Sequence, residues 1–100
     1  MEFWMKVHEN PQGRVVAVCD RSLLGRVFER GNQKLDLMTY AAFYKGVEAG
    51  KREVLEEIKN FSSLNIVGSG AVELAIGAGL MEKAQVRKIA GVPQAQVYRI

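Results

Sequence analysis

The sequence has few of the residues that cross-link a small domain or hold a metal ion. Its 100 residues include a single cysteine, Cys19, and a single histidine, His8. One cysteine cannot form an internal disulfide, and one cysteine with one histidine does not complete a closed zinc site. We therefore expect no metal and no cofactor, and a fold that rests on its hydrophobic core in a reducing compartment.

Long hydrophobic runs are also missing. The longest apolar stretch, Ala71 to Met81, is interrupted by Glu73 and is too short to cross a bilayer. At the N-terminus, Glu2 and Lys6 flank the apolar residues 3–5, a pattern unlike that of a signal peptide. The sequence therefore predicts a cytoplasmic protein with no membrane partner.

A dense block of positive charge is absent as well. The net charge is +3, and the 25% of charged residues are spread over both halves of the chain beside 48% hydrophobic residues. This composition is typical of an ordinary globular protein, and the length is that of one domain. We expect a single domain over residues 1–100, with a weakly basic surface that leaves an anionic partner open.

The first third of the chain predicts two strands and a short helix. Apolar and polar residues alternate over residues 3–8, and a turn sequence at residues 10–13 separates them from the β-branched run Arg14 to Cys19. Such an unbroken run is typical of a central strand buried on both faces. Asp20 or Ser22 is then expected to cap a short helix over residues 23–28.

The remaining residues predict further strands and helices. The expected elements are a short strand at 34–38, a helical or irregular turn at 39–44, a helix at 51–61 with Val54, Leu55, Ile58 and Phe61 inward, a strand at 65–67, an enclosed helix at 70–78 capped by Gly79, and strands at 86–90 and 95–100. The fold class is α+β or α/β: one domain with a mixed sheet of about five to six short strands and about three helices.

The turn Gly68-Ser69-Gly70 lies between an expected strand and an expected helix. Backbone N–H groups at a helix start favour anions, so this turn is a candidate anion or ligand site. The alternative is a purely structural turn with Ser69 as N-cap. Glu73 is either a carboxylate favoured by the helix dipole or an acid–base group in a pocket with this turn, Gln94 and Gln96.

A second candidate site combines rings with positive charge on the expected sheet. Trp4 and Lys6 share one side of the first strand, and four further residues gather near the C-terminus: Arg87, Lys88, Tyr98 and Arg99. Stacking rings with cations and amides on a sheet are typical of single-stranded RNA recognition. The alternative is a solvated sheet face with cations along its rim.

Several motifs in order along the chain resemble one family, the archaeal domain of unknown function four hundred twenty-four. The motifs are Ala17-Val18-Cys19-Asp20 with Leu23-Leu24-Gly25, Phe43-Tyr44-Lys45-Gly46, Asn65-Ile66-Val67-Gly68 running into Ala71-Val72-Glu73-Leu74-Ala75, and Gly91-Val92-Pro93 with Ala95-Gln96. The resemblance implies a single-domain cytoplasmic protein with no assigned activity, encoded near translation and ribosome-maturation genes. Gln94 stands where the family motif has histidine, which argues against proton transfer by this motif.

The sequence holds no recognisable catalytic constellation, so we expect a binding protein rather than an enzyme. The favoured hypothesis is a module that binds RNA or a translation-related protein. The second is a small enzyme or ligand-binding protein with a pocket at Gly68–Gly70. The third is a structural homodimer or adaptor that pairs through its last strand.

Overall fold

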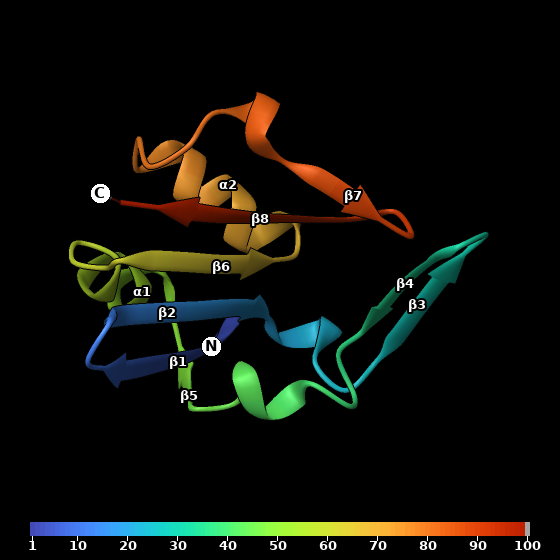
Figure 1. Cartoon of the computed structure of the whole chain (residues 1–100), viewed down its shortest axis with the longest axis horizontal. Coiled ribbons are helices and arrows are strands. Elements are labelled where there is room, and N and C mark those ends of the chain that lie inside the picture. Colours follow the sequence, from blue (N-terminus) through green and yellow to red (C-terminus); the bar gives the residue numbers. More distant parts are fainter. Residues whose placement is uncertain (100) are drawn as a thin grey trace.

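The computed structural model describes residues 1–99 and consists of a six-stranded sheet, two α-helices and a separate hairpin (Figure 1). The sheet order is β5-β1-β2-β6-β8-β7, with β2 and β6 parallel and the other pairs antiparallel. The strands are β1 (Phe3–Asn10), β2 (Gly13–Asp20), β3 (Val27–Arg30), β4 (Gln33–Asp36), β5 (Val47–Ala49), β6 (Ser63–Val67), β7 (Arg87–Ile89) and β8 (Val92–Tyr98). The helices are α1 (Lys51–Glu57) and α2 (Ser69–Gly77), and three 3₁₀ turns are η1 (Arg21–Leu23), η2 (Ala41–Phe43) and η3 (Lys83–Gln85).

This architecture confirms the mixed sheet and the α+β class, but residues 1–99 contain two α-helices instead of about three. The expected helix at residues 23–28 was wrong: this segment forms η1, a turn and strand β3. Leu23, Leu24 and Phe28 pack on buried Cys19 and Val67 at one end of the sheet. An apolar spacing that suits a helix serves here to anchor a hairpin.

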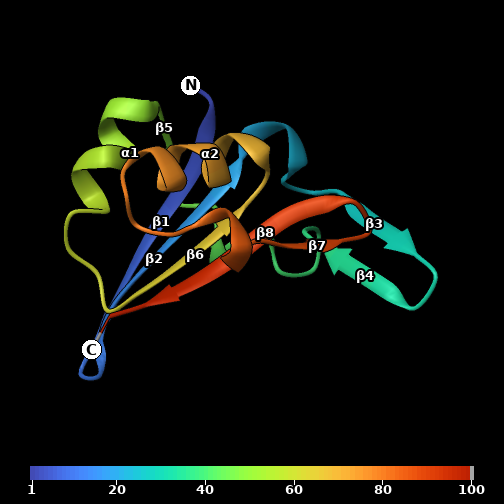
Figure 2. The ribbon, with the colours of Figure 1, turned by 90° about the horizontal axis from the view of Figure 1, so that it is seen from above.

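Strand β2 lies inside the sheet and is buried on both faces, as predicted. Val16 and Val18 face α1 and α2, whereas Cys19 faces the second, smaller core under the β3–β4 hairpin. Figure 2 shows both helices on the same side of the sheet. Since the two faces of β2 meet different layers, both of its alternating sets of side chains are apolar.

The two helices cover one face of the sheet with only part of their surfaces. α1 buries Val54, and Ile58 and Phe61 follow it into the core, whereas Leu55 is 37% exposed and was wrongly placed on the inner stripe. α2 buries Ala71, Val72 and Ala75, but Glu73 is exposed. The helix is therefore less enclosed than the sequence predicts.

The last described strand, β8, is an interior strand and not the expected edge. It pairs with β6 from Val67–Gln94 to Ser63–Tyr98, and with β7 only over Val92–Gln94. The expected strand extended to Ile100, which lies outside the described residues. No helix within residues 1–99 has the length and apolar character needed to span a membrane.

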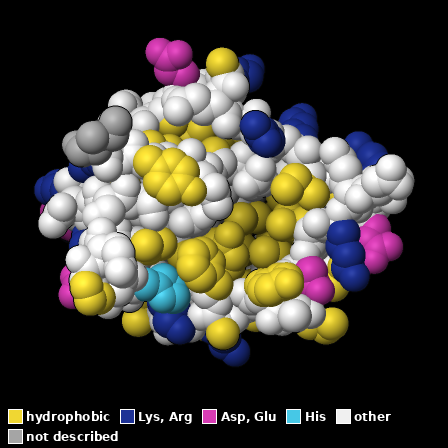
Figure 3. All heavy atoms as spheres, viewed as in Figure 1, with side chains coloured by type: hydrophobic (Ala, Val, Ile, Leu, Met, Phe, Trp, Pro, Cys, Tyr) yellow, Lys and Arg dark blue, Asp and Glu magenta, His cyan; other side chains and the backbone are white. Residues whose placement is uncertain are grey.

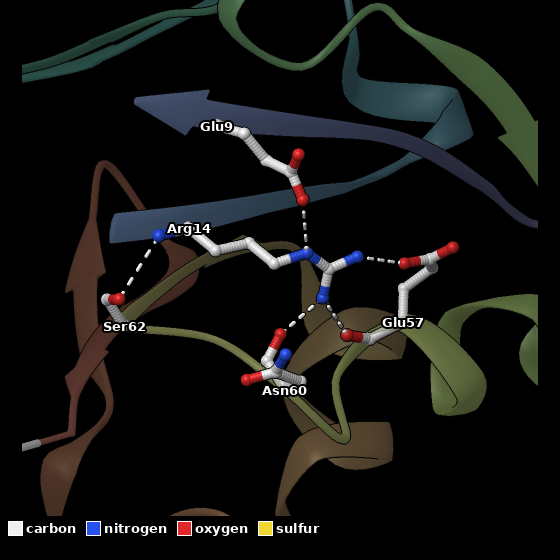
Figure 4. A network of polar contacts seen from close by, with 5 residues as sticks. All are labelled: Glu9, Arg14, Glu57, Asn60 and Ser62. Atoms are coloured by element: carbon white, nitrogen blue, oxygen red, sulfur yellow. Dashed lines mark hydrogen bonds and ion pairs between the residues drawn. The ribbon is translucent and has the colours of Figure 1, made fainter. Parts of the chain in front are cut away.

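Arg14 joins the β1–β2 hairpin to the end of α1 (Figure 4). Its guanidinium donates to the backbone carbonyls of Glu57 and Asn60 and forms ion pairs with the carboxylates of Glu9 and Glu57. The backbone N–H of Arg14 donates to Ser62 Oγ at 3.1 Å. A cation at the C-terminal carbonyls of a helix is favourable, so Arg14 fixes where α1 ends relative to the sheet.

Asp20, the last residue of β2, caps the start of α2. Its carboxylate accepts hydrogen bonds from the backbone N–H groups of Gly70 at 2.9 Å and Ala71 at 2.8 Å. A Cβ on Gly68, whose φ is +105°, would lie 2.3 Å from the carboxyl carbon of Asp20. Glycine is therefore required for this close approach, and Asp20 satisfies amide groups that a helix start leaves unpaired.

Replacing Asp20 is expected to destabilise the fold. Asp20→Ala removes both cap hydrogen bonds and should lower the free energy of unfolding by about 1–3 kcal/mol in urea titrations. Asp20→Asn keeps one acceptor oxygen and should lose less. Asp36 also accepts two backbone N–H bonds, from Met38 and Thr39, but in an exposed turn, so Asp36→Ala is a matched control with a smaller loss. Equal losses at the two positions would contradict the role of Asp20.

Candidate functional site

The sheet face opposite α1 and α2, called the open face below, carries three rows of residues across the strands. Strand alternation and register place Lys6, Ala17, Asn65 and Gln96 in the middle row. One flanking row runs from Trp4 through Cys19, Val67 and Gln94 to Arg87, and the other from His8 through Val15 and Ser63 to Tyr98. The open face therefore combines rings, amides and cations from segments far apart in sequence.

The segment around η2 covers the β1 side of the open face. Lys6 Nζ donates to the carbonyl of Ala42 at 2.9 Å, and His8 Nε2 lies 2.9 Å from the carbonyl oxygen of Phe43. The rings of His8 and Phe43 stack with centroids 4.8 Å apart. These contacts hold the ring-bearing segment beside the sheet, where it forms one wall of a concavity.

Two of the hollows on this face share Gln96. The central hollow, of about 560 Å³, has Asn65 and Gln96 on the sheet side and the rings of Tyr40, Phe43 and Tyr44 opposite. The side hollow, of about 320 Å³, is bordered by Arg87, Gln94, Gln96 and Tyr98. Figure 3 shows this concave surface with hydrophobic side chains gathered inside it and charged groups around its rim.

A chain of polar groups crosses the floor between the hollows. The Tyr98 hydroxyl donates to Gln96 Oε1 at 3.0 Å, and the Gln96 amide donates to Asn65 Oδ1 at 2.8 Å. This arrangement orients three exposed or half-exposed polar side chains in one plane of the sheet. It offers hydrogen-bond donors and acceptors beside aromatic rings, a combination that suits a flat polar ligand such as a nucleic-acid base.

Four of the six residues expected on the nucleic-acid face lie on the open face: Trp4, Lys6, Arg87 and Tyr98. Arg87 and Tyr98 border the side hollow, whereas Trp4 and Lys6 lie on β1 and line neither hollow. Lys88 pairs with Pro93 across β7 and β8, which places it on the helix side of the sheet. Arg99 lies near the end of α1, where it donates to the carbonyl of Lys59 and sits 4.0 Å from the Phe61 ring centroid. Strand alternation therefore corrects the assignment of Lys88.

Sequence reasoning missed contributors to the central hollow, among them Lys34, Tyr40, Phe43 and Asn65. The rings at residues 39–44 were visible in the sequence, but the segment has no strand or long helix period that would tell which face it covers. Trp4 is less available than expected, because Lys45 Nζ lies 5.6 Å from its ring centroid.

The ligand pocket expected at Gly68–Gly70 is divided by the sheet. Asp20 already accepts the N–H groups of Gly70 and Ala71, so a protein carboxylate stands where an anion was expected. The N-cap residue of α2 is Gly68, and Ser69 makes no cap hydrogen bond. Ser69 and Glu73 line a cleft on the helix side, whereas Gln94 and Gln96 lie on the open face.

Cys19, which is buried, and Tyr44, which is half-buried, are protonated at neutral pH. Burial, reinforced by the neighbouring Asp20 carboxylate, raises the pKa of the Cys19 thiol to about 12. Burial also raises the pKa of the Tyr44 hydroxyl to about 12, with a smaller contribution from Cys19. Backbone N–H groups of Thr39 and Met38 lower the pKa of Asp36 at the rim. The thiol is thus a packing group rather than a nucleophile.

Comparison with known families places the chain in one of them. The model of a protein family of unknown function, DUF424, matches residues 7–100. The chain belongs to the DUF424 family. No curated protein matches the chain.

A solved structure shares the fold of this DUF424 protein. The crystal structure of an uncharacterized conserved protein from Methanopyrus kandleri aligns over 96% of this chain and 90% of its own, with a TM-score of 0.79 and 23% sequence identity. The source organism agrees with the archaeal link that the motifs implied. The similarity shows that the two proteins share their overall fold.

Cys19 is expected to resist thiol reagents in the folded protein. With a pKa near 12, the thiolate fraction at pH 8 is about one in ten thousand, and the side chain is shielded from solvent. Reaction with 5,5′-dithiobis(2-nitrobenzoic acid) should be slow in buffer and fast in denaturing urea. Rapid modification of the native protein at pH 8 would contradict the packing role.

Proposed function

We propose that this DUF424 protein is a binding module whose open face binds single-stranded RNA in the cytoplasm, in a translation-related setting. The observation that carries the proposal is the pairing of exposed rings with an oriented amide floor. Tyr40 and Tyr98 are 66% and 69% exposed, and Asn65 and Gln96 lie in the hollows that these rings border. Bases stack on such rings, and amides bind base edges.

The charges around the hollows also support an anionic partner. Lys34 lines the central hollow, and its only ion pair within residues 1–99 is a long one, 3.9 Å to Glu29. Arg87 borders the side hollow and has no ion pair among the described residues. Asp36 is the acidic group at the central hollow, and its carboxylate is turned to the N–H groups of Met38 and Thr39.

The arrangement favours binding over catalysis. The ionisable groups that line the two hollows are the cations Lys34 and Arg87, the turn-capping Asp36, and the tyrosines at 40, 44 and 98. The Asp36 carboxylate already accepts two backbone N–H groups. Gln94, in place of the histidine of the family motif, lies beside Arg87 and adds an amide to the same surface. Hydrogen bonding and stacking are the chemistry that these groups supply.

Removing an exposed ring should weaken RNA binding without unfolding the domain. Tyr98→Ala and Tyr40→Ala are each expected to cost about 1–3 kcal/mol if a base stacks on the ring, a loss of roughly five- to 150-fold in affinity. The measurement is fluorescence anisotropy of a labelled mixed-sequence single-stranded RNA at low salt. Thermal melting shows whether each variant is folded.

The salt dependence of RNA affinity separates the contribution of charge from that of stacking. Two phosphate contacts give a slope of about −1.4 for log affinity against log salt concentration, and Lys34→Ala with Arg87→Ala should bring it close to zero. The matched control is Lys51→Ala with Arg52→Ala, which removes the same charge from exposed positions on α1. No binding at low salt, or equal slopes for the two double variants, would overturn the RNA proposal. Light scattering would then test a second copy of the chain as the partner.

A further inference from the structure

A further hollow lies on the opposite side of the sheet from the proposed RNA site. This α2–β7 cleft has a volume of about 870 Å³ and runs between α2 and the segment from η3 through β7. It is formed because α2 covers the middle of the sheet and leaves the β7 edge beside it open. No residue of the RNA proposal lines it.

The cleft has an apolar floor. Val72 and Ile76, one helical turn apart, face it from α2, and Val86 and Pro93 face it from the other wall. Ile76 and Val86 remain partly exposed although both pack against the main core. The floor therefore presents hydrophobic surface that a bound apolar group would cover.

Two lysines and one carboxylate border this floor. Lys83 begins η3, Lys88 projects from β7 on the helix side, and Glu73 borders the cleft from α2. None of these three charged groups has an ion-pair partner within 4 Å among residues 1–99. The cleft thus carries an excess positive charge that the protein itself does not neutralise.

The lysine-bearing wall is held in place by its own hydrogen bonds. The Gln85 side-chain oxygen accepts from the Glu82 N–H at 2.8 Å, and the Val86 N–H donates to the Lys83 carbonyl at 3.1 Å. On the other side, β7 is paired with β8 through Lys88–Pro93. The two ammonium groups therefore project from ordered backbone on one side of an apolar floor.

We propose that the α2–β7 cleft binds a small organic anion, a carboxylate or phosphate group joined to an apolar body. The anionic group binds Lys83 and Lys88, and the apolar body lies on Val72, Ile76 and Val86. Glu73 opposes the anion and restricts it to the lysine side of the cleft. This site is independent of the open face, because the two lie on opposite sides of the sheet.

The probe is 8-anilinonaphthalene-1-sulfonate, whose sulfonate stands in for the carboxylate or phosphate. The neutral N-phenyl-1-naphthylamine has the same apolar body and no charge. Both are titrated by fluorescence into the native protein, and amide chemical shifts locate the bound probe. Shifts confined to Val72, Ile76, Val86 and Lys88 support the proposal, and shifts confined to other residues overturn it.

Charge variants then test the roles of the bordering groups. Lys83→Ala with Lys88→Ala should weaken the sulfonate probe roughly three- to tenfold and leave the neutral probe within twofold. Glu73→Gln should strengthen the sulfonate probe, because it removes a repelling carboxylate. Lys51→Ala with Arg52→Ala is the control of equal charge. The proposal would be overturned if the Lys83/Lys88 double variant and the Lys51/Arg52 control weakened the sulfonate probe equally. Weaker binding of this probe to Glu73→Gln would also overturn it.

RNA binding is measured on the same variants. The Lys83 and Lys88 substitutions should leave RNA affinity unchanged, and the Lys34 and Arg87 substitutions should leave the sulfonate probe unchanged. If the Lys83/Lys88 double variant lost both RNA and the sulfonate probe, the two sites would not be independent.

Discussion

The contact between the Asp20 carboxylate and the first turn of α2 fixes how this helix lies on the sheet, and the rest of the helix side depends on it. It joins the end of β2 to a helix fifty residues later in the chain, through the N–H groups of Gly70 and Ala71. The contact supplies the anion that a helix N-terminus favours, so the start of α2 needs no external ligand. It also fixes α2 over the middle of the sheet, which leaves the β7 edge uncovered and creates the α2–β7 cleft.

The open face is also covered only in part, by the β3–β4 hairpin, and this again leaves a hollow beside the covering element. The β3–β4 hairpin packs on Cys19, Val67 and Val92 and seals only the end of the sheet at which β2 and β6 terminate. In the middle row, Asn65 and Gln96 stay accessible, and their polar side chains are compatible with solvent. A hairpin that covered the whole face would have required apolar residues in that row. The polar residues of this row are therefore compatible with the fold because the hairpin leaves them uncovered.

Local patterns predicted the parts of the fold that depend on neighbouring residues. The β1–β2 hairpin, the doubly buried β2 and the turn at Gly79 just after α2, where φ is +76°, all follow from periodicity or turn chemistry. The segment Leu23–Phe28 could not be assigned this way, because its apolar spacing fits a helix as well as an anchor for a hairpin. The partner of Asp20 could not be found either, since the cap joins residues 20 and 70, and nothing in the local sequence at either position indicates the other.

The division between the two sites comes down to strand alternation at two consecutive residues. Arg87 and Lys88 are adjacent cations on β7, and the sequence alone groups them into one basic patch. In the sheet, Arg87 pairs with Gln94 on the open face, whereas Lys88 pairs with Pro93 and faces α2. Because side chains along a strand point to opposite faces in turn, one short strand supplies a cation to each side. A weakly basic protein can in this way present two separate positive surfaces without any local block of charge, which is why composition gave only a faint indication of either.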